Sequence, residues 1–476
     1  MRPRRLLLGL LLWGGSVHGE GRPPYGGRLV APLGSTVRSL DPAAAELPGE
    51  LTLAQLLFET PFTVDGAGRV RPQLIARIEP GEGTRVRLIL RPGLTFHDGR
   101  RLLAGDVAAS LNRALRQVTA WPLAPLKSAR AVDEAVVEVE LSRAAPDLPW
   151  LLASPVAAVT PAGQAPGRAA VGSGPFRLLA WEKRSLRLAA NPRCSSGRPY
   201  LDEVSLRLFA SRTEEAGSYE VGSSQLSLHG ATAFEGGAPK HPTAILDGPR
   251  TVALALAFGR GTQLPGATAT ATLPGEVNFR RLLGAAIDRE RLRRLAVHEP
   301  AQVVATLIPG GARSVGERPK ATAELGRLLG GARLHAALLI EGARFHQREV
   351  AEQLLAELGE LGVEVTIDVA DGRSFHQRLA EGRFDLALVE AGALGGLEQP
   401  ALAALGLLAT VDPRTARALL ARAPAELATV EKVVAERLPF TPLLLRQQRL
   451  HHRADLRGLA IDGLGRVGLA DAFVGR

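Results

Sequence analysis

The sequence predicts an α/β protein with more than one lobe, and three observations lead to this fold class. The chain has 476 residues, which is more than one compact core usually holds. Residues 334–389 alternate strand and helix patterns, and residues 86–115 form a separate block of strands, turns and one helix. Apolar residues make up 46% of the chain and charged residues 22%, which is the ordinary composition of a globular protein.

The stretch 334–389 gives the clearest α/β pattern. Its three strands are expected at 334–340, 363–369 and 384–389. The helix that begins near Gln347 carries one apolar face, made of Val350, Leu354, Leu358 and Leu361. Gly362 follows that face, where a C-terminal glycine is favoured, and a short helix is expected at 374–381. Connections of this length predict right-handed crossovers and a parallel sheet.

Residues 86–115 predict two short strands and a helix, joined by tight turns. Val86, Leu88 and Leu90 alternate with polar residues, as in a half-buried strand. The sequence His97-Asp98-Gly99 is typical of a tight turn. After this turn, apolar residues recur at a spacing of four on one helix face: Leu103, Val107, Leu111 and Leu115.

The remaining elements are expected along the rest of the chain. Strands are predicted at 29–33, 132–141, 176–181, 185–189, 201–209, 251–258 and 443–445. Helices are predicted at 51–58, 146–155 and 416–438. Residues 210–250 show little periodicity, so no element is assigned to them.

The charge and cysteine content exclude some classes of function. Lysine and arginine total 58 against 48 acidic residues, which gives a formal net charge of +10. No basic run is interleaved with aromatic residues, as a nucleic-acid groove would require, so nucleic-acid binding is not expected. Cys194 is the single cysteine, which excludes an intramolecular disulfide, and we expect an inert thiol.

The first nineteen residues resemble a secretory signal peptide. Arg2, Arg4 and Arg5 precede a short apolar core at 6–13, and Gly19 is small enough for a cleavage site. No cysteine near this point would carry a lipid anchor, and no later segment is long and apolar enough for a membrane span. We therefore expect a protein that is free in the periplasm.

Several motifs in fixed order resemble one known family. They are LDP at 40–42, LLFETPF at 56–62, LILRPGLTFHDGRRLLAGDVAASLNRAL at 88–115, GSGPFRLLAW at 172–181, FRRLLGAAIDRERL at 279–292, FDLALVE at 384–390 and RLPFTPLLL at 437–445. Together they are similar to extracellular solute-binding proteins of family 5, the dipeptide-, oligopeptide- and nickel-binding components of ABC importers.

The resemblance implies a periplasmic-binding-protein-like fold of type II, with two lobes, a hinge and an inserted domain. Lobe I would comprise 28–46, 170–247 and 436–476, the inserted domain 47–169, and lobe II 248–435. The lobes would capture a small peptide or related solute and deliver it to an inner-membrane ABC permease. A monomer without cofactor, metal or catalytic residues is implied.

Candidate ligand-binding residues follow from the resemblance. Family members that bind peptides place an acidic residue and an aromatic residue in the loop after the FDLALVE strand. In this chain the loop at 391–400 has no Trp and no Asp, so only Glu390 and Glu398 could supply negative charge. Asp41 and Ser173 complete the predicted ligand-binding set. A divergent sensor or scaffold for a non-peptide solute is the alternative that this departure leaves open.

Other local patterns permit sharper interpretations, and each has a simpler alternative. The repeated Phe-His-Gln-Arg at 345–348 and 375–378 could pair two histidines on a metal, but isolated histidines at helix starts are the simpler interpretation. His451-His452 is expected in a solvated turn, and the basic residues of 280–294 on a solvated helix face. His97 and Ser110 are too far apart in the predicted elements to form a catalytic pair. A secreted hydrolase is therefore not expected.

Overall fold

In a computed structural model of the chain, the described residues are 23–34, 37–45, 47–65, 69–164, 166–167, 169–228, 240–259, 276–296, 300–304, 318–342, 344–392, 400–424, 426–462 and 466–475. The predicted signal peptide lies outside them. Within these residues, no helix is both long enough and apolar enough to cross a bilayer.

The first of three larger sheets forms the core of lobe I. Its strand order is β1-β10-β9-β8, with β1 parallel to β10 and the other pairs antiparallel. The strands are β1 (Arg28–Pro32), β8 (Phe176–Trp181), β9 (Ser185–Ala190) and β10 (Glu203–Arg207). The helix α1 (Pro48–Leu57) packs its buried leucines against this sheet, in one cluster with Leu29, Phe176 and Val204. The predicted strands at 29–33, 176–181 and 185–189 are therefore confirmed.

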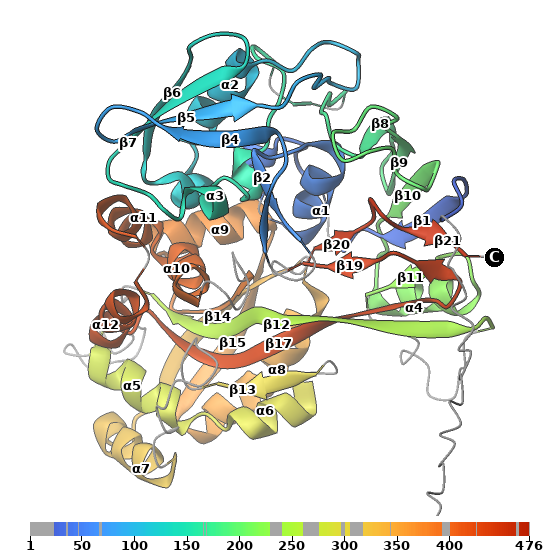
Figure 1. Ribbon diagram of the computed structural model, residues 1–476. Helices are drawn as coiled ribbons and strands as arrows, with labels where there is room; N and C mark the ends of the chain where they lie inside the picture. Colours follow the sequence, from blue (N-terminus) through green and yellow to red (C-terminus); the bar gives the residue numbers. More distant parts are fainter. Residues whose placement is uncertain are drawn as a thin grey trace, which may run out of the picture.

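The second sheet builds the inserted domain, at the top of Figure 1. It is antiparallel, in the order β4-β5-β7-β6, and the helix α2 (Ala104–Ala114) packs on it. The strands are β4 (Ile75–Pro80), β5 (Arg85–Leu90), β6 (Leu126–Ala131) and β7 (Val136–Leu141). Val107 and Leu111 are fully buried, as the spacing of four predicts. The hairpin β2 (Phe62–Val64) and β3 (Val70–Pro72), the short helix α3 (Leu148–Leu151) and the 3₁₀ turns η2 (Val118–Leu123) and η3 (Pro155–Ala157) complete the domain.

The third sheet is mixed and forms lobe II. Its order is β11-β17-β12-β16-β14-β15, with β13 also paired to β17. β14 is parallel to β15 and to β16, which confirms the parallel βαβ arrangement, whereas β12 and β17 join antiparallel. The strands are β11 (Leu226–Ser227), β12 (Thr243–Phe258), β13 (Ala301–Val303), β14 (Leu334–Glu341), β15 (Val363–Ala370), β16 (Leu386–Gly392) and β17 (Phe440–Arg453).

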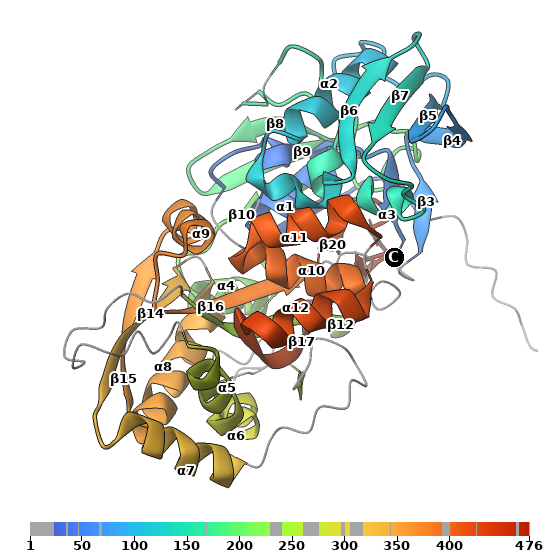
Figure 2. The ribbon, with the colours of Figure 1, turned by 90° about the vertical axis from the view of Figure 1, so that its left-hand side faces the viewer.

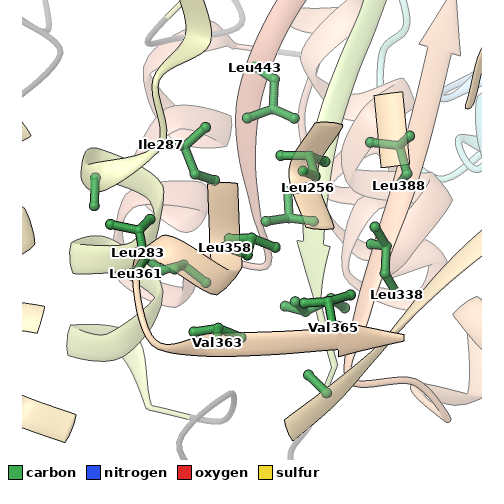
Figure 3. Packing of buried hydrophobic residues seen from close by; sticks show 14 of the residues in the cluster. Leu256, Leu283, Ile287, Leu338, Leu358, Leu361, Val363, Val365, Leu388 and Leu443 are labelled. Carbon is green, nitrogen blue, oxygen red and sulfur yellow. The ribbon is translucent and has the colours of Figure 1, made fainter. Parts of the chain in front are cut away.

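Helices cover both faces of this sheet. One face carries α5 (Val277–Ala286), α6 (Arg289–Ala296), α7 (Arg318–Leu329) and α8 (Phe345–Glu360). The other face carries α9 (Gly372–Glu381), α10 (Pro400–Val411), α11 (Pro413–Arg422) and α12 (Leu427–Arg437). Figure 3 shows the first of these cores, where Leu358 of α8 and Leu256 of β12 lie among other aliphatic side chains. The four apolar positions predicted for the helix near Gln347 are all buried in it.

Two long strands connect lobe I to lobe II. β12 and β17 run side by side across the molecule (Figure 1), and Leu450 of β17 packs in the lobe I core while Leu444 packs in the lobe II core. The pairing register shifts between Asp247 and Val252, so the ladder is irregular between the two cores. The sequence had suggested only 251–258 and 443–445, because polar residues interrupt the apolar pattern in the middle of each strand.

Three other expectations are corrected. Residues 210–250 contain α4 (Arg212–Glu220) and the start of β12, and the predicted helix at 416–438 is two helices, α11 and α12. His451 and His452 lie in β17, opposite β11, and not in a turn. The C-terminus adds two small hairpins: β18 (Leu456–Arg457) with β21 (Phe473–Val474), and β19 (Ala460–Ile461) with β20 (Val467–Gly468).

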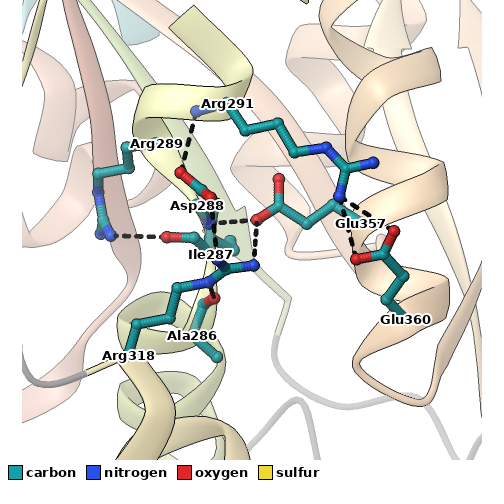
Figure 4. Close-up of polar contacts among 8 residues, drawn as sticks. All are labelled: Ala286, Ile287, Asp288, Arg289, Arg291, Arg318, Glu357 and Glu360. Atoms are coloured by element: carbon teal, nitrogen blue, oxygen red, sulfur yellow. Dashed lines mark hydrogen bonds and ion pairs between the residues drawn. The ribbon is translucent and has the colours of Figure 1, made fainter.

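The basic residues of α5 and α6 are not all on a solvated face. Arg280 is buried and donates to the carbonyl of Gly259 at 2.7 Å, and Arg289 donates to the carbonyl of Pro442 at 2.9 Å. Burial lowers the pKa of Arg289 to about 10. The other arginines of these helices follow the prediction: Arg281 and Arg294 are exposed, and Arg291 forms a partly exposed pair with Glu360 of α8 at 3.0 Å (Figure 4). Arginine therefore ties strand and helix ends together inside lobe II.

Candidate functional site

A cavity of about 610 Å³ lies where lobe I, the inserted domain and lobe II meet. Lobe I contributes residues from the loop before α1 and from η1 (Pro42–Ala44), and the inserted domain contributes Gln117, directly before η2. Lobe II contributes the outer faces of α9 and α11. The lining residues are Arg38, Ser39, Ala44, Glu50, Gln117, Arg373, His376, Gln377, Ala380, Glu381, Pro413, Arg414 and Arg417.

Positive charge dominates this lining. Four arginines face two glutamates, and both glutamates already have cationic partners. Glu50 accepts hydrogen bonds from the backbone and side chain of Arg38 at 3.0 Å, while Glu381 pairs with Arg383. The hydrogen bonds from Gln377 and Arg383 lower the pKa of Glu381, which keeps it ionised at neutral pH. Among the described residues, Arg373 of α9 and Arg414 of α11 have no acidic partner.

A second cluster of charges lies next to this cavity but is buried. Arg344, just before α8, contacts Glu341 at 2.7 Å and Glu390 at 2.8 Å, and Arg446 of β17 contacts Glu390 at 2.7 Å. The side chains of Glu341 and Glu390 are 0% and 2% exposed. We call these four residues the buried ion-pair network. Two acids and two arginines balance one another within it.

The charges within the buried ion-pair network keep Arg344 protonated. Burial alone would lower the pKa of Arg344, but the charges of Glu341 and Glu390 outweigh burial and raise it. The arginine therefore stays cationic, and the two acids keep a charged partner. A buried pair of this kind contributes little net stability, yet removal of one partner is expensive because a charge is left uncompensated.

Gly372 marks the boundary between the network and lobe I. A Cβ atom at Gly372, the first residue of α9, would lie 2.9 Å from Glu341 Oε1, 3.1 Å from Leu47 Cδ2 and 3.4 Å from Arg38 Nη1. The backbone of α9 thus passes close to side chains of both lobes. Only glycine permits this approach without displacement of a neighbour.

Of the predicted ligand-binding residues, Glu390 lies at the junction of the lobes as expected. Its carboxylate, however, is bound on both sides by Arg344 and Arg446. Glu398 lies outside the described residues, as does most of the loop at 391–400. The ligand-binding roles of both glutamates stay predictions.

Asp41 joins lobe I to the inserted domain. Its Oδ1 accepts a hydrogen bond from the backbone of Ala43 at 2.9 Å, as the N-cap of η1, and it forms an ion pair with Arg113 of α2. Arg113 also donates to Thr160 at 3.3 Å. Asp41 therefore does not line the cavity, although Ser39 and Ala44 beside it do.

Ser173 is 1% exposed and lies beside Glu59, a buried acid that sequence reasoning did not single out. Burial raises the pKa of Glu59, and side-chain hydrogen bonds from Ser195 and Cys194 oppose that rise. No arginine takes part in these contacts. Burial together with the nearby Glu59 raises the pKa of Cys194 to about 11, in line with the inert thiol expected.

His97 holds the inserted domain against the 172–174 segment. Its backbone donates to the carbonyl of Gly172 at 2.7 Å, and its Nε2 lies 3.1 Å from the carbonyl of Gly174. A Cβ atom at Gly172 would lie 1.8 Å from the carbonyl oxygen of Leu57, so only glycine fits there. The His97-Asp98-Gly99 turn is thus confirmed, and its histidine also fixes the approach of two units.

The metal interpretation gains no support from geometry. Among the residues that the structure describes, no group of three or more His, Cys, Asp or Glu side chains could hold a metal ion. His376 lines the cavity on α9, while the side chain of His346 lies outside the described residues. Ser110 hydrogen-bonds the backbone of Thr160 and is not a partner of His97.

Direct contacts across the lobes complete the site. Arg212 of α4 pairs with Glu349 of α8 at 3.1 Å. Arg143 of the inserted domain donates to the carbonyl of Leu420 on α11 at 2.9 Å, and Arg417 of α11 donates to the carbonyl of Leu115 at 3.3 Å. Figure 2 shows α10 and α11 below the inserted domain, between it and β12. The cavity therefore lies among units that also contact one another directly.

A comparison with protein families agrees with the two-lobed arrangement described above. The model of bacterial extracellular solute-binding proteins, family 5 Middle, matches residues 69–410. The chain belongs to this family. Its members are solute-binding proteins that act outside the cytoplasm.

Curated relatives match over part of their length. An uncharacterized protein of Bacillus subtilis, YhjP, is 30% identical over 204 residues, which is 42% of this chain and 35% of that protein. The transcriptional regulator SgrR of Pectobacterium atrosepticum is 28% identical over 38% of this chain and 33% of its own. The matched region spans about a third of these relatives.

Solved structures of similar fold cover nearly the whole chain. The oligopeptide-binding protein AppA of Bacillus subtilis with a nonapeptide has a TM-score of 0.75 at 16% identity, over 96% of this chain and 100% of that one. AgaA of A. tumefaciens R10, with agropinic acid, has a TM-score of 0.79 at 19% identity, over 94% and 99%. The murein tripeptide binding protein MppA of Escherichia coli has a TM-score of 0.78 at 16% identity, over 94% and 98%. These likenesses confirm the two-lobed fold.

Proposed function

We propose that this protein captures a small solute between its lobes and delivers it to an ABC permease of the inner membrane. The observation that carries the proposal is the cavity of about 610 Å³ at the junction of the three units. Its size suits a small molecule, since such sites usually measure about 300–1,000 Å³. The long strands β12 and β17 provide the connection about which the lobes could open and close.

A peptide or a related small solute is the ligand class that family membership favours. Two proteins of the same fold are peptide-binding proteins. AppA was solved with a nonapeptide, and MppA is a murein tripeptide binding protein. The protein would work as a monomer, without catalysis, in the periplasm after removal of residues 1–19. We also propose the boundaries of the three units. Lobe I comprises 28–46, 170–247 and 436–476, the inserted domain 47–169, and lobe II 248–435.

Thermal unfolding with a solute panel tests the proposal. A bound solute stabilises the folded protein by mass action, so di- to pentapeptides should raise the melting temperature by several degrees. No shift with any peptide, together with a shift for another solute, would contradict the peptide assignment. Mass spectrometry of the solute that co-purifies with the protein gives its composition directly.

A solute sensor is the second candidate function. It is favoured by the match to SgrR, a transcriptional regulator. Co-purification with a membrane-embedded permease separates the two functions. A stable permease complex supports transport, whereas solute binding without any permease contact supports a sensor.

A further inference from the structure

We propose that the solute held in this cavity is a small anion, bound through carboxylate or phosphate oxygens by Arg373, Arg414 and Arg417. The inference rests on the proposed function and narrows the class of solute. It concerns a different part of the lobe junction from Glu390, whose carboxylate is already bound by two arginines.

The first argument is charge balance within the lining. Glu50 is bound by Arg38, and Glu381 is bound by Arg383, so neither acid is available to the remaining arginines. In the part of the chain that the structure describes, no hydrogen bond or ion pair engages the guanidinium groups of Arg373 and Arg414. Arg417 makes one bond, to the carbonyl of Leu115. Three cationic groups therefore face the cavity without an anionic partner.

The second argument is the position of two of these arginines in their helices. Arg373 is the second residue of α9 and Arg414 the second residue of α11, and an aspartate caps each helix immediately before. A cation in the first turn of a helix opposes the helix dipole, so neither arginine stabilises its own helix. Asp371 and Asp412 already cap the two helix N-termini, so an anion in the cavity would be bound by the guanidinium groups and not by free helix ends.

The third argument is the chemistry of the walls. Guanidinium groups bind carboxylates and phosphates through paired hydrogen bonds. Gln117, Ser39 and Gln377 add neutral donors from three different segments. Among the described residues, the lining includes no Phe, Tyr or Trp, and its apolar residues are Ala44, Ala380 and Pro413. The described lining thus offers cationic and hydrogen-bonding groups, but no aromatic side chain on which a ring of the solute could stack.

The alternative is that Arg373 and Arg414, which are exposed, are merely solvated surface residues. A matched control is Arg327 of α7, which is also exposed and lies outside the cavity. Citrate and inorganic phosphate are the probes, titrated calorimetrically at low ionic strength into three proteins. These are the wild type, the double variant Arg373→Gln with Arg414→Gln, and Arg327→Gln.

The expected result is that at least one probe binds the wild type and Arg327→Gln equally. The double variant should bind it at least about 10-fold more weakly, since both substitutions remove charge-assisted hydrogen bonds to the anion. Binding should also weaken as salt is raised, because the sites face solvent.

Equal affinity in the double variant, or no binding of either probe to the wild type, overturns the inference. Failure of the proposed function looks different, because then no solute of any charge would stabilise the protein. A neutral or cationic solute that co-purifies and binds the double variant normally would overturn the anion inference alone.

Discussion

The two groups of charge at the lobe junction differ in one decisive respect. In the buried ion-pair network, Glu341 and Glu390 are matched by Arg344 and Arg446 at 2.7–2.8 Å, and almost no solvent reaches the acids. In the cavity next to it, Arg373 and Arg414 are exposed and have no acidic partner among the described residues. Gly372, the first residue of α9, lies between the two groups.

The difference indicates which charges are structural and which are available to a solute. A buried charge must be compensated inside the protein, because desolvation would otherwise neutralise or destabilise it. An exposed charge needs no such partner and can pair with an incoming ligand. By this criterion Glu390, one of the two glutamates that the sequence predicts as ligand-binding, has a carboxylate that is already compensated inside the protein, and its binding role stays a prediction. Arg373 and Arg414 have no such partner among the described residues.

The largest effect should come from a break in the network. Among the described residues, Arg344 is the cation paired with Glu341, so Arg344→Leu would leave that acid uncompensated and Glu390 with one arginine fewer. We expect lobe II to lose about 3–5 kcal/mol of unfolding free energy. Urea denaturation followed by far-UV circular dichroism measures this loss.

The control for that change is Arg348→Leu, which removes an exposed pair with Glu352 at 3.3 Å on the same helix. Its cost should be about 0.2–1 kcal/mol. Similar losses for both variants would show that the network does not depend on burial.

The next largest effect is expected at the boundary. Gly372→Ala would place a Cβ atom 2.9 Å from Glu341 Oε1, and Arg344 holds that carboxylate in place. Because the neighbours must shift, we expect a loss of about 1–3 kcal/mol. Gly326 of α7 has open space around it, so Gly326→Ala should instead stabilise the protein by about 0.5–1 kcal/mol. Thermal unfolding measures both variants. Stabilisation by both substitutions would contradict the close approach.

Glu59 is a buried acid of a different kind from Glu390. The Ser195 hydroxyl and the Cys194 thiol contact Glu59, whereas two arginines contact Glu390. Burial raises the folded-state pKa of Glu59 above the ordinary value of 4.5, so the folded state binds a proton more tightly than the unfolded state. Stability is therefore lost as pH rises from about 4.5 through the folded pKa. Glu59→Gln should match the wild type at pH 4 and become relatively more stable above it. A constant difference in melting temperature between pH 4 and pH 8 would contradict the raised pKa.

The smallest effect is expected from the ion pair that crosses the lobes. Arg212→Gln removes the contact with Glu349, and both side chains are partly exposed. We expect solute affinity to fall by no more than about 5-fold, which corresponds to about 1 kcal/mol. Arg184→Gln, which removes a pair with Glu214 inside lobe I, is the control and should leave affinity unchanged. Calorimetric titration compares the two, and equal losses would argue against a role of the cross-lobe pair in closure.

Local pattern was enough to predict much of the fold. The apolar face at Val350, Leu354 and Leu358 identified α8, because the spacing of buried residues in a helix depends on the chain alone. The length of β12 and β17 could not be read in the same way. Their middle sections lie between two cores, where polar residues such as Arg446 are paired within the structure and the apolar pattern is lost.

The site was harder to predict than the fold. Arg344, Glu390 and Arg446 meet only because β14, β16 and β17 belong to one sheet, with β12 between β16 and β17, and this strand order is not visible in a local stretch of sequence. One feature of the sequence could have indicated the pair: Glu390 and Arg446 each directly follow a run of buried apolar residues. Arg373 and Arg414 had a similar unused indication, since each follows a helix cap where a cation is unfavourable.

The most direct measurement is a crystal structure of the protein with the solute that co-purifies with it. The account predicts an anionic group of that solute in hydrogen-bond contact with Arg373 and Arg414, while Glu390 keeps its contacts with Arg344 and Arg446. A structure in which Glu390 leaves its arginines to bind a cationic group of the solute would contradict it.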